Sequence, residues 1–292
     1  MSLIVRTNSD HVLPSGMRLH VHRFEPANSA PTGLTVLMLH GFLDCGATWD
    51  LVAEPLARAG HDVLVPDLRG FGSSAYVGAG GYYHFPDYVG DVAALVDQLD
   101  PKRLALIGHS MGGTVASLYA GAMPERLEKL ALLEGIGAIH AGPTATLTRM
   151  RTWLDDMRKL DTWNRPLASL DEAVERLMRM HSSVPRDRIE SRARLLTRID
   201  AAGQLRWAHD PLHRTTSPTP FSVDAFKGFL QNITAPTLYV SGGSIGWRLP
   251  DEKERLECIA NVTHVDLQDA GHMMHWKAPE AVAECLLRFL AS

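Results

Sequence analysis

The sequence has few cysteines, and this scarcity excludes two kinds of site. Its three cysteines, Cys45, Cys258 and Cys285, show neither CxxC spacing nor clustered histidines around them. A disulfide framework or a structural zinc site needs such spacing, so the sequence predicts neither, and a reducing compartment fits best.

Positive charge and long apolar runs are also scarce. The formal net charge is -4, and no Lys/Arg-rich run or nucleic-acid module is present, so nucleic acid is not an expected partner. No apolar run approaches the length that spans a bilayer, and the first 16 residues lack a charged segment followed by an apolar one. We therefore expect a soluble, cytoplasmic protein that does not bind membranes; its oligomeric state is not predicted.

Short buried-looking runs alternate with amphipathic segments along most of the chain. With 292 residues, 45% of them hydrophobic, the chain can bury a large core. The runs LTVLMLHG, HDVLVPD, KRLALIGHS and LEKLALLEG alternate with helical patterns over 49–59, 87–99 and 111–122. This rhythm predicts an α/β fold with a mostly parallel central sheet flanked by helices.

The rhythm is interrupted between residues 144 and 230. That stretch contains helix-like segments without buried-strand runs, such as SLDEAVERLMRMH, where Ser169 and Glu172 form a capping box. The strand pattern then resumes in APTLYVSGG and NVTHVDLQDAGH, and 279–290 forms a closing amphipathic helix. We predict one sheet domain formed by 1–143 and 231–292, with an inserted helical cap over 144–230.

A candidate nucleophile lies in Gly108-His109-Ser110-Met111-Gly112-Gly113. This segment follows the run LALI and opens a helix, which is where a G-x-S-x-G turn exposes its serine at the carboxyl edge of a sheet. The glycines permit the strained turn. A serine hydroxyl needs a neighbouring base to become a nucleophile, and the histidines His40, His109, His264, His272 and His275 compete for this role.

Four segments carry a family resemblance: HGF at 40–42, PDLRGFGSS at 66–74, GHSMGG at 108–113 and DAGHMMHWKAPE at 269–280. Together they resemble the α/β-hydrolase fold superfamily. The resemblance implies that the backbone N–H groups of Phe42 and Met111 form the oxyanion hole. It also implies that His272 is the general base, and no metal or organic cofactor is required.

The acid partner of the histidine is less obvious. The loop after PTLYV commonly supplies an aspartate in the family, but here Ser241 to Gly246 contain no carboxylate. Glu134, directly after a buried run, would be costly to ionise unless paired with an imidazolium. Asp251 is the second candidate, although it more readily caps the following helix. Glu134 is preferred, with a structural role for its carboxylate, or a dyad without an acid, as alternatives.

The predicted cap contains more Arg and Lys than Asp and Glu. This balance suits either an entrance for anionic or carrier-bound acyl substrates or a solvated surface of local ion pairs. The stretch GQLRWAHDPLHRT is similar to lids of serine-hydrolase-like proteins and of thioesterase domains that release polyketide chains. That similarity makes Arg206 a candidate contact for an anionic group, and Trp207 and His109 are further candidate substrate contacts. The cap aromatics could line an acyl pocket or pack on the core: Trp153, Trp163, Trp207, Phe221, Phe226 and Phe229.

The predicted activity is hydrolysis of a carboxylic ester or thioester through an acyl-Ser110 intermediate, with a Ser110–His272–Glu134 triad. Carbon–carbon bond hydrolases and perhydrolases use the same Ser-His pair and remain alternatives. A serine at position 110 argues against dehalogenase or epoxide hydrolase chemistry, since those relatives carry an aspartate there. A ligand-binding or signalling protein that kept the pocket and lost turnover is the alternative from a different class.

Overall fold

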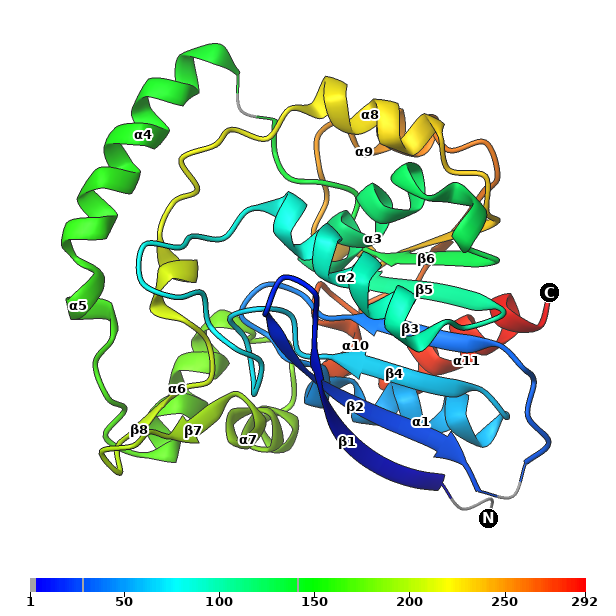
Figure 1. Cartoon of the computed structure of the whole chain (residues 1–292), viewed down its shortest axis with the longest axis horizontal. Coiled ribbons are helices and arrows are strands. Elements are labelled where there is room, and N and C mark those ends of the chain that lie inside the picture. The colour runs from blue at the N-terminus through cyan, green and yellow to red at the C-terminus, as the bar shows by residue number, and fades with distance from the viewer. Residues whose placement is uncertain (1–3, 28, 141) are drawn as a thin grey trace.

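The computed structural model describes residues 4–27, 29–140 and 142–292, and its centre is an eight-stranded sheet (Figure 1). The strand order is β1-β2-β4-β3-β5-β6-β9-β10. β2 pairs antiparallel with both β1 and β4, and all other neighbouring pairs are parallel, which confirms the predicted sheet. The strands are β1 Ile4–Val12, β2 Arg18–Pro26, β3 Thr35–Leu39, β4 Asp62–Pro66, β5 Leu104–His109, β6 Lys129–Leu133, β9 Thr237–Ser241 and β10 Val262–Asp266.

Helices cover both faces of this sheet. Successive side chains of a strand point to opposite faces, so Leu104 and Leu106 of β5 join one core cluster and Ala105 and Ile107 join the other. The first cluster includes residues of α2 (Phe85–Leu99), α3 (Met111–Ala122) and α8 (Val223–Gln231). The second includes residues of α1 (Asp50–Arg58) and α11 (Pro279–Ala291). Burial on both faces explains why the central strands read as continuous apolar runs.

The N-terminal hairpin β1–β2 was not predicted from the sequence. Its nine residue pairs run from Ile4 opposite Pro26 to Val12 opposite Arg18. Most side chains of β1 are exposed, so this edge strand lacks the apolar alternation that would indicate a half-buried strand.

A second layer of helices lies beside the sheet, between β6 and β9 in the sequence (Figure 1). It consists of α4 (Pro143–Arg158), α5 (Leu160–Trp163), α6 (Leu170–Met180), α7 (Arg186–Leu195) and a hairpin of β7 (Thr197–Ile199) and β8 (Leu205–Trp207). The hairpin was not predicted, because strands of three residues carry no readable periodicity. Apolar residues of α6 and α7 form a third core cluster that includes Cys45 and Trp276 of the sheet domain.

The helix α8 was predicted to belong to the cap, and that part of the prediction is wrong. Phe226 and Leu230 are buried in the first core cluster, against the sheet. A Cβ on Gly121 of α3 would lie 2.3 Å from the carbonyl oxygen of Phe229, so α3 and α8 pack backbone against backbone. The amphipathic pattern of α8 could not show which of the two layers its apolar face would meet.

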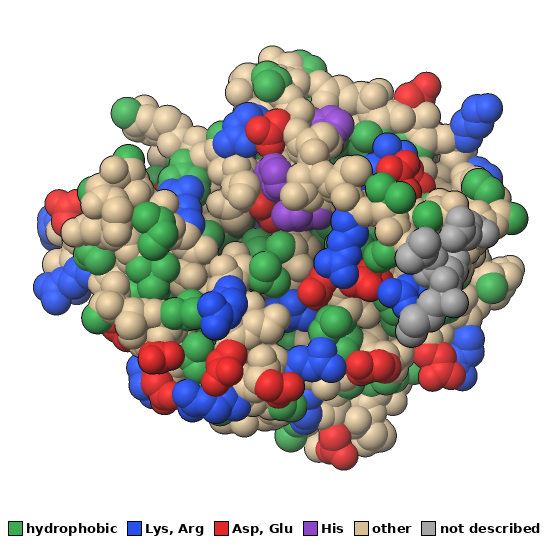
Figure 2. Space-filling model, turned by 90° about the horizontal axis from the view of Figure 1, so that it is seen from below, with side chains coloured by type: hydrophobic (Ala, Val, Ile, Leu, Met, Phe, Trp, Pro, Cys, Tyr) green, Lys and Arg blue, Asp and Glu red, His purple; other side chains and the backbone are tan. Residues whose placement is uncertain are grey.

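The surface carries charges of both signs. Figure 2 shows Lys, Arg, Asp and Glu side chains interspersed over one face, with histidines gathered beside a hollow. Within the described residues, no helix has both the length and the apolar character needed to cross a membrane.

We expect the third core cluster to stabilise the second layer of helices. Leu177 of α6 is 5% exposed, so Leu177→Ala should lower the free energy of unfolding by about 2–4 kcal/mol, through lost burial and the cavity left behind. Urea unfolding monitored by circular dichroism measures this difference. The matched control is Leu154→Ala on α4, where the side chain is 45% exposed and the expected change is within about 0.5 kcal/mol. Equal effects at the two positions would contradict the assigned packing.

Candidate active site

Ser110 lies at a sharp turn between β5 and α3. Its backbone has φ +52° and ψ -116°, a conformation that side-chain-bearing residues rarely adopt. The turn is held by a hydrogen bond from the Ser110 N–H to the carbonyl of Leu133, 2.9 Å long. A Cβ on Gly112 would lie 2.4 Å from the carbonyl oxygen of Leu39, so a larger residue would push α3 away from β3. The strained turn therefore depends on the glycines that flank the serine.

His272 connects Ser110 with Glu134. Its Nε2 lies 3.1 Å from the Ser110 Oγ, and its Nδ1 lies 2.8 Å from the Glu134 Oε2. The three residues come from the end of β5, the end of β6 and the loop after β10, which meet at one edge of the sheet. The histidine side chain is 33% exposed and the glutamate side chain is fully buried. This arrangement is the one that a nucleophile needs, with a base beside it and a third group that orients the base.

The Glu134 carboxylate also binds the loop that lacks an aspartate. Its Oε1 accepts the Gly242 N–H at 2.6 Å, and its Oε2 accepts the Trp247 N–H at 2.7 Å. A Cβ on Gly246 would lie 2.0 Å from Oε1, so the absence of a side chain there leaves room for the carboxylate. Glu134 therefore contacts His272, as its preferred interpretation predicts. Its carboxylate also has the structural role that was the alternative, because it accepts hydrogen bonds from two loop amides.

Asp251 lies elsewhere and pairs with Arg255. It precedes α9 (Glu252–Leu256), but its carboxylate accepts from the Arg255 Nε at 2.9 Å and does not cap the helix. Arg255 is fully buried and also donates to the carbonyls of Ile136 and Ala138, each at 2.9 Å. The expectation that the Asp251 side chain caps the helix is therefore wrong, because the buried guanidinium is a stronger partner for the carboxylate.

The amides of Phe42 and Met111 are the predicted oxyanion donors. Met111 is the first residue of α3, where an amide has no partner within the helix. Phe42 follows Gly41 in the loop after β3, and in the described part of the chain no backbone carbonyl accepts its N–H. Met111 follows Ser110 in the chain, and the loop of Phe42 lies close to Ser110, since a Cβ on Gly41 would be 3.2 Å from the Ser110 Cβ.

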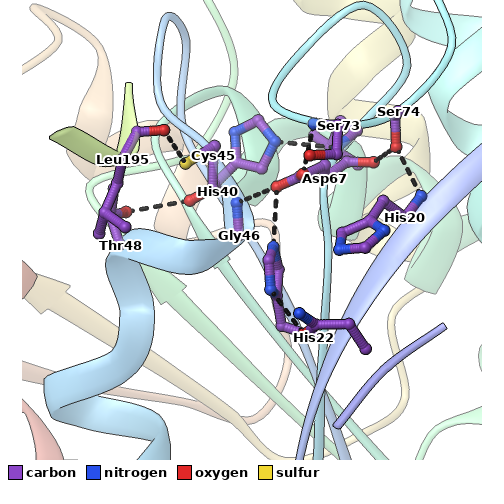
Figure 3. Close-up of polar contacts among 12 residues, drawn as sticks. His20, His22, His40, Cys45, Gly46, Thr48, Asp67, Ser73, Ser74 and Leu195 are labelled. Carbon is purple, nitrogen blue, oxygen red and sulfur yellow. Dashed lines mark hydrogen bonds and ion pairs between the residues drawn. The ribbon is translucent and has the colours of Figure 1, made fainter. Parts of the chain in front are cut away.

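Buried polar groups hold the loop that carries Phe42 (Figure 3). The Nε2 of His40 accepts the Leu68 N–H at 2.9 Å, so its Nδ1 carries the proton and donates to the Gly41 carbonyl at 2.8 Å. The carboxylate of Asp67 accepts the Gly46 N–H at 2.7 Å. Burial alone would raise the pKa of Asp67, but its contacts with His22 and with backbone amides lower that pKa below the ordinary value. An ionised carboxylate thus anchors the loop.

His109 was predicted to contact substrate, and its position contradicts this. The side chain is 1% exposed and lies behind Ser110, where its Nε2 is 2.7 Å from the carbonyl oxygen of His272. Burial lowers the pKa of His109 well below its ordinary value, and the neighbouring rings of His275 and His272 lower it further. A neutral, buried ring cannot touch a bound substrate in this structure.

The other competing histidines have structural partners. His40 anchors the loop described above, and the Nε2 of His264 contacts the Ser241 Oγ at 2.8 Å on the far side of β9. The Nε2 of His275 lies 2.9 Å from the Asp44 Oδ2 and both side chains are buried. Among these four competitors, none contacts the Ser110 hydroxyl in the described part of the chain.

One buried cluster has residue types that can bind a metal ion. Side-chain atoms of Asp44, His109 and His275 lie within 4.8 Å of one another. The Nε2 atoms of both histidines and the carboxylate already have hydrogen-bond partners. The Nδ1 atoms of both histidines have no hydrogen-bond partner among the described residues, so these three side chains do not fully satisfy one another.

Arg206 is already neutralised, which argues against the predicted contact with an anionic group. Its guanidinium donates to the Asp200 carboxylate, to Gln204 at 2.8 Å and to the Asn164 side chain at 3.0 Å. Arg206 and Trp207 line a cavity of about 750 Å³ between the cap and the loop 76–82. Neither Ser110 nor His272 is among the described residues that line this cavity.

The aromatic residues that were predicted to belong to the cap do not form one pocket. Trp153 and Trp207 line the cavity beside Arg206, whereas Phe221 and Phe226 pack together at 5.2 Å near the sheet. Trp163 lies under the guanidinium of Arg214. Sequence spacing could not separate cavity-lining aromatics from packing ones, because both occur at helical intervals.

An aromatic stack that the sequence did not predict lies next to Phe42. The ring of His213 stacks on Phe71 and on Tyr83, each with centroids 3.9 Å apart, and its centroid is 6.3 Å from that of Phe42. Burial lowers the pKa of His213 to about 3. The only sequence signal was that His213 falls within the lid-like stretch GQLRWAHDPLHRT.

With the geometry established, comparison with known proteins identifies the family. The sequence pattern of the alpha/beta hydrolase fold family matches residues 35–279. The chain belongs to this family. The match includes Ser110, Glu134 and His272, and it confirms the resemblance drawn from the four sequence segments.

Three proteins that are similar to this chain have names that refer to different activities. A serine hydrolase-like protein of Danio rerio is 36% identical over 129 residues, covering 44% of this chain and 39% of that protein. A 2-hydroxy-6-oxononadienedioate/2-hydroxy-6-oxononatrienedioate hydrolase of Klebsiella pneumoniae is 29% identical, covering 88% of this chain and 87% of that protein. The thioesterase domain from the curacin biosynthetic pathway superposes with a TM-score of 0.84 at 24% identity, over 97% of this chain and 99% of that domain, which shows a shared fold.

Because His213 is buried and its pKa is lowered, we predict that the folded protein loses stability as the pH falls. A histidine with a depressed pKa in the folded state gains its proton on unfolding, so stability is lost as pH falls from the unfolded value of about 6.5 toward the folded one. With a folded pKa of about 3, this residue should cost about 2 kcal/mol of stability between pH 7.5 and pH 5. Urea unfolding at the two pH values measures the loss.

Two variants isolate this contribution. His213→Gln should lose less stability between pH 7.5 and pH 5 than the wild type, although it is less stable at both. The control is His140→Gln, at an exposed position, which should retain the wild-type difference. The same pH dependence in all three proteins would exclude His213 as its source.

Proposed function

We propose that the chain is a serine hydrolase that cleaves a carboxylic ester or thioester through an acyl-Ser110 intermediate. The observation that carries the proposal is the position of His272, within hydrogen-bond distance of both the Ser110 Oγ (3.1 Å) and the Glu134 Oε2 (2.8 Å). Membership of the alpha/beta hydrolase fold family supports the reaction class.

In the proposed reaction, the Nε2 of His272 takes the Ser110 proton while Oγ attacks the carbonyl carbon. The histidine then gives this proton to the leaving alcohol or thiol, and later activates water to hydrolyse the acyl-enzyme. Glu134 accepts the Nδ1–H, which keeps Nε2 free of a proton and stabilises the imidazolium. The amides of Phe42 and Met111 bind the oxyanion of each tetrahedral intermediate. The scheme uses no metal or organic cofactor.

Apolar side chains around His272 support a substrate with an apolar group next to the carbonyl. The Trp247 ring is 6.3 Å from the His272 ring and is half exposed, and a Cβ on Gly271 would lie 3.4 Å from the Ile245 Cδ1. Phe42 is also about half exposed. Half-exposed apolar side chains beside reactive groups are typical of a ligand-binding surface.

A carbon–carbon bond hydrolase is the second candidate, because the Klebsiella pneumoniae relative is similar over most of both chains. The dioate in that relative's name carries two carboxylates, which would need cationic or amide partners in a binding site. Two of the side chains near His272, Trp247 and Ile245, are apolar, and Arg206 is paired with Asp200. These contacts favour the ester or thioester.

The decisive experiment measures hydrolysis of p-nitrophenyl esters and acyl thioesters of increasing chain length. Ser110→Ala should abolish turnover, and Glu134→Gln should lower kcat by about a hundredfold or more, because the amide leaves the imidazolium unstabilised. Asp251→Asn is the matched control and should keep wild-type kcat. Loss of activity at Asp251 with retention at Glu134 would refute the proposed triad.

A fluorophosphonate probe separates an enzyme from a binding protein with a retained pocket. If His272 activates Ser110, the probe should label the wild type at least about a hundredfold faster than Glu134→Gln, and it should not label Ser110→Ala. Mass spectrometry of the labelled peptide identifies the modified residue. Labelling that is equally slow in the wild type and Glu134→Gln would point to a binding protein.

A further inference from the structure

His109 connects the rigid sheet to the loop that carries His272. It is the last residue of β5, where it pairs with Leu133 of β6 in the middle of the sheet. His272 lies on a loop between β10 and α10 (Met274–Lys277), outside any strand or helix. Groups held by strands are more precisely placed than groups held by loops. A hydrogen bond from His109 can therefore fix the position of the His272 loop relative to the sheet.

The contact is a hydrogen bond whose direction is determined by its partner. The Nε2 of His109 lies 2.7 Å from the carbonyl oxygen of His272, and a carbonyl can only accept. The His109 ring must therefore carry its proton on Nε2. Burial lowers the pKa of His109 well below the ordinary value, so the ring stays neutral and keeps this tautomer. His272 is thus held twice, through its side chain by Glu134 and through its backbone by His109.

The His109 ring has little freedom to leave this position. A Cβ on Gly41 would lie 2.8 Å from the His109 Nδ1, so the loop that carries Phe42 packs against that edge of the ring. The ring of His275 lies 4.6 Å away, centroid to centroid. His275 is itself bound to Asp44, and the Asp44 Oδ1 accepts from the Cys45 N–H at 2.8 Å and from the Thr48 hydroxyl at 2.7 Å.

We propose that His109 is a positioning residue, which aligns His272 with Ser110 through its hydrogen bond to the His272 carbonyl, while the Asp44–His275 pair supports it from behind. The proposal rests on the proposed function only in taking Ser110 and His272 as the reacting pair. It replaces the substrate contact predicted for His109 from sequence.

Two substitutions of equal side-chain length test the hydrogen bond. His109→Gln keeps an N–H donor near the position of Nε2, whereas His109→Met has none. The readout is the fluorophosphonate labelling of Ser110, as a maximal rate and a half-saturating probe concentration. The Met variant should lower the maximal rate about tenfold to a hundredfold without changing half-saturation, and the Gln variant should stay within about threefold of the wild type. Equal rates in Gln and Met variants would overturn the proposal.

A spectroscopic measurement on the wild-type protein also tests the proposal. The ¹⁵N chemical shifts of the His109 ring, assigned by comparison with His109→Gln, report which nitrogen carries the proton. Protonation at Nε2 agrees with the proposal, and protonation at Nδ1 overturns it. If the wild type hydrolyses no ester or thioester while the labelling rates still follow the Gln and Met series, the proposed substrate class fails and the role of His109 stands.

Discussion

The buried carboxylate of Glu134 is the group on which the geometry of the site depends. An ionised carboxylate inside a protein costs several kcal/mol unless hydrogen bonds replace its water. Three donors do so here: the amides of Gly242 and Trp247 and the Nδ1 of His272. They come from the loop after β9 and the loop after β10, so one side chain at the end of β6 orders both loops.

The sheet register explains how Glu134, directly after β6, comes to lie next to the loop after β9, where an aspartate is expected. Leu133 pairs with Val240, and the Glu134 N–H donates to the Val240 carbonyl at 3.0 Å, so the two strand ends are adjacent. Glu134 has φ +43°, which turns the chain at the strand end. At the end of β9, the Ser241 hydroxyl donates to the Asp266 carboxylate at 2.6 Å. The loop at the usual acid position thereby supplies amide donors in place of a carboxylate.

Local sequence patterns predicted those features of the fold that are determined by a few neighbouring residues. The buried strands and the turn at Ser110 were readable, because apolar period and glycine placement are encoded within a few residues. The choice of His272 came instead from the resemblance to the family. Long-range partners were not readable. The contact of Arg206 with Asn164, the burial of His109 and the docking of α8 on α3 depend on segments that are distant in the sequence. The exposed strand β1 has no apolar pattern, so its place in the sheet was invisible for a different reason.

The helices α6 and α7 pack on residues that are close in the chain to the candidate site. The cluster formed by α6 and α7 packs on Cys45 and Trp276, which are the chain neighbours of Asp44 and His275. Those two neighbours bind each other behind His109, at 2.9 Å between Nε2 and Oδ2. The helices α6 and α7 are thus connected, through Cys45 and Trp276, with the loop that carries Phe42 and with the segment that carries His272. Because both segments contact His109, a continuous set of buried contacts runs from these helices to the His272 backbone.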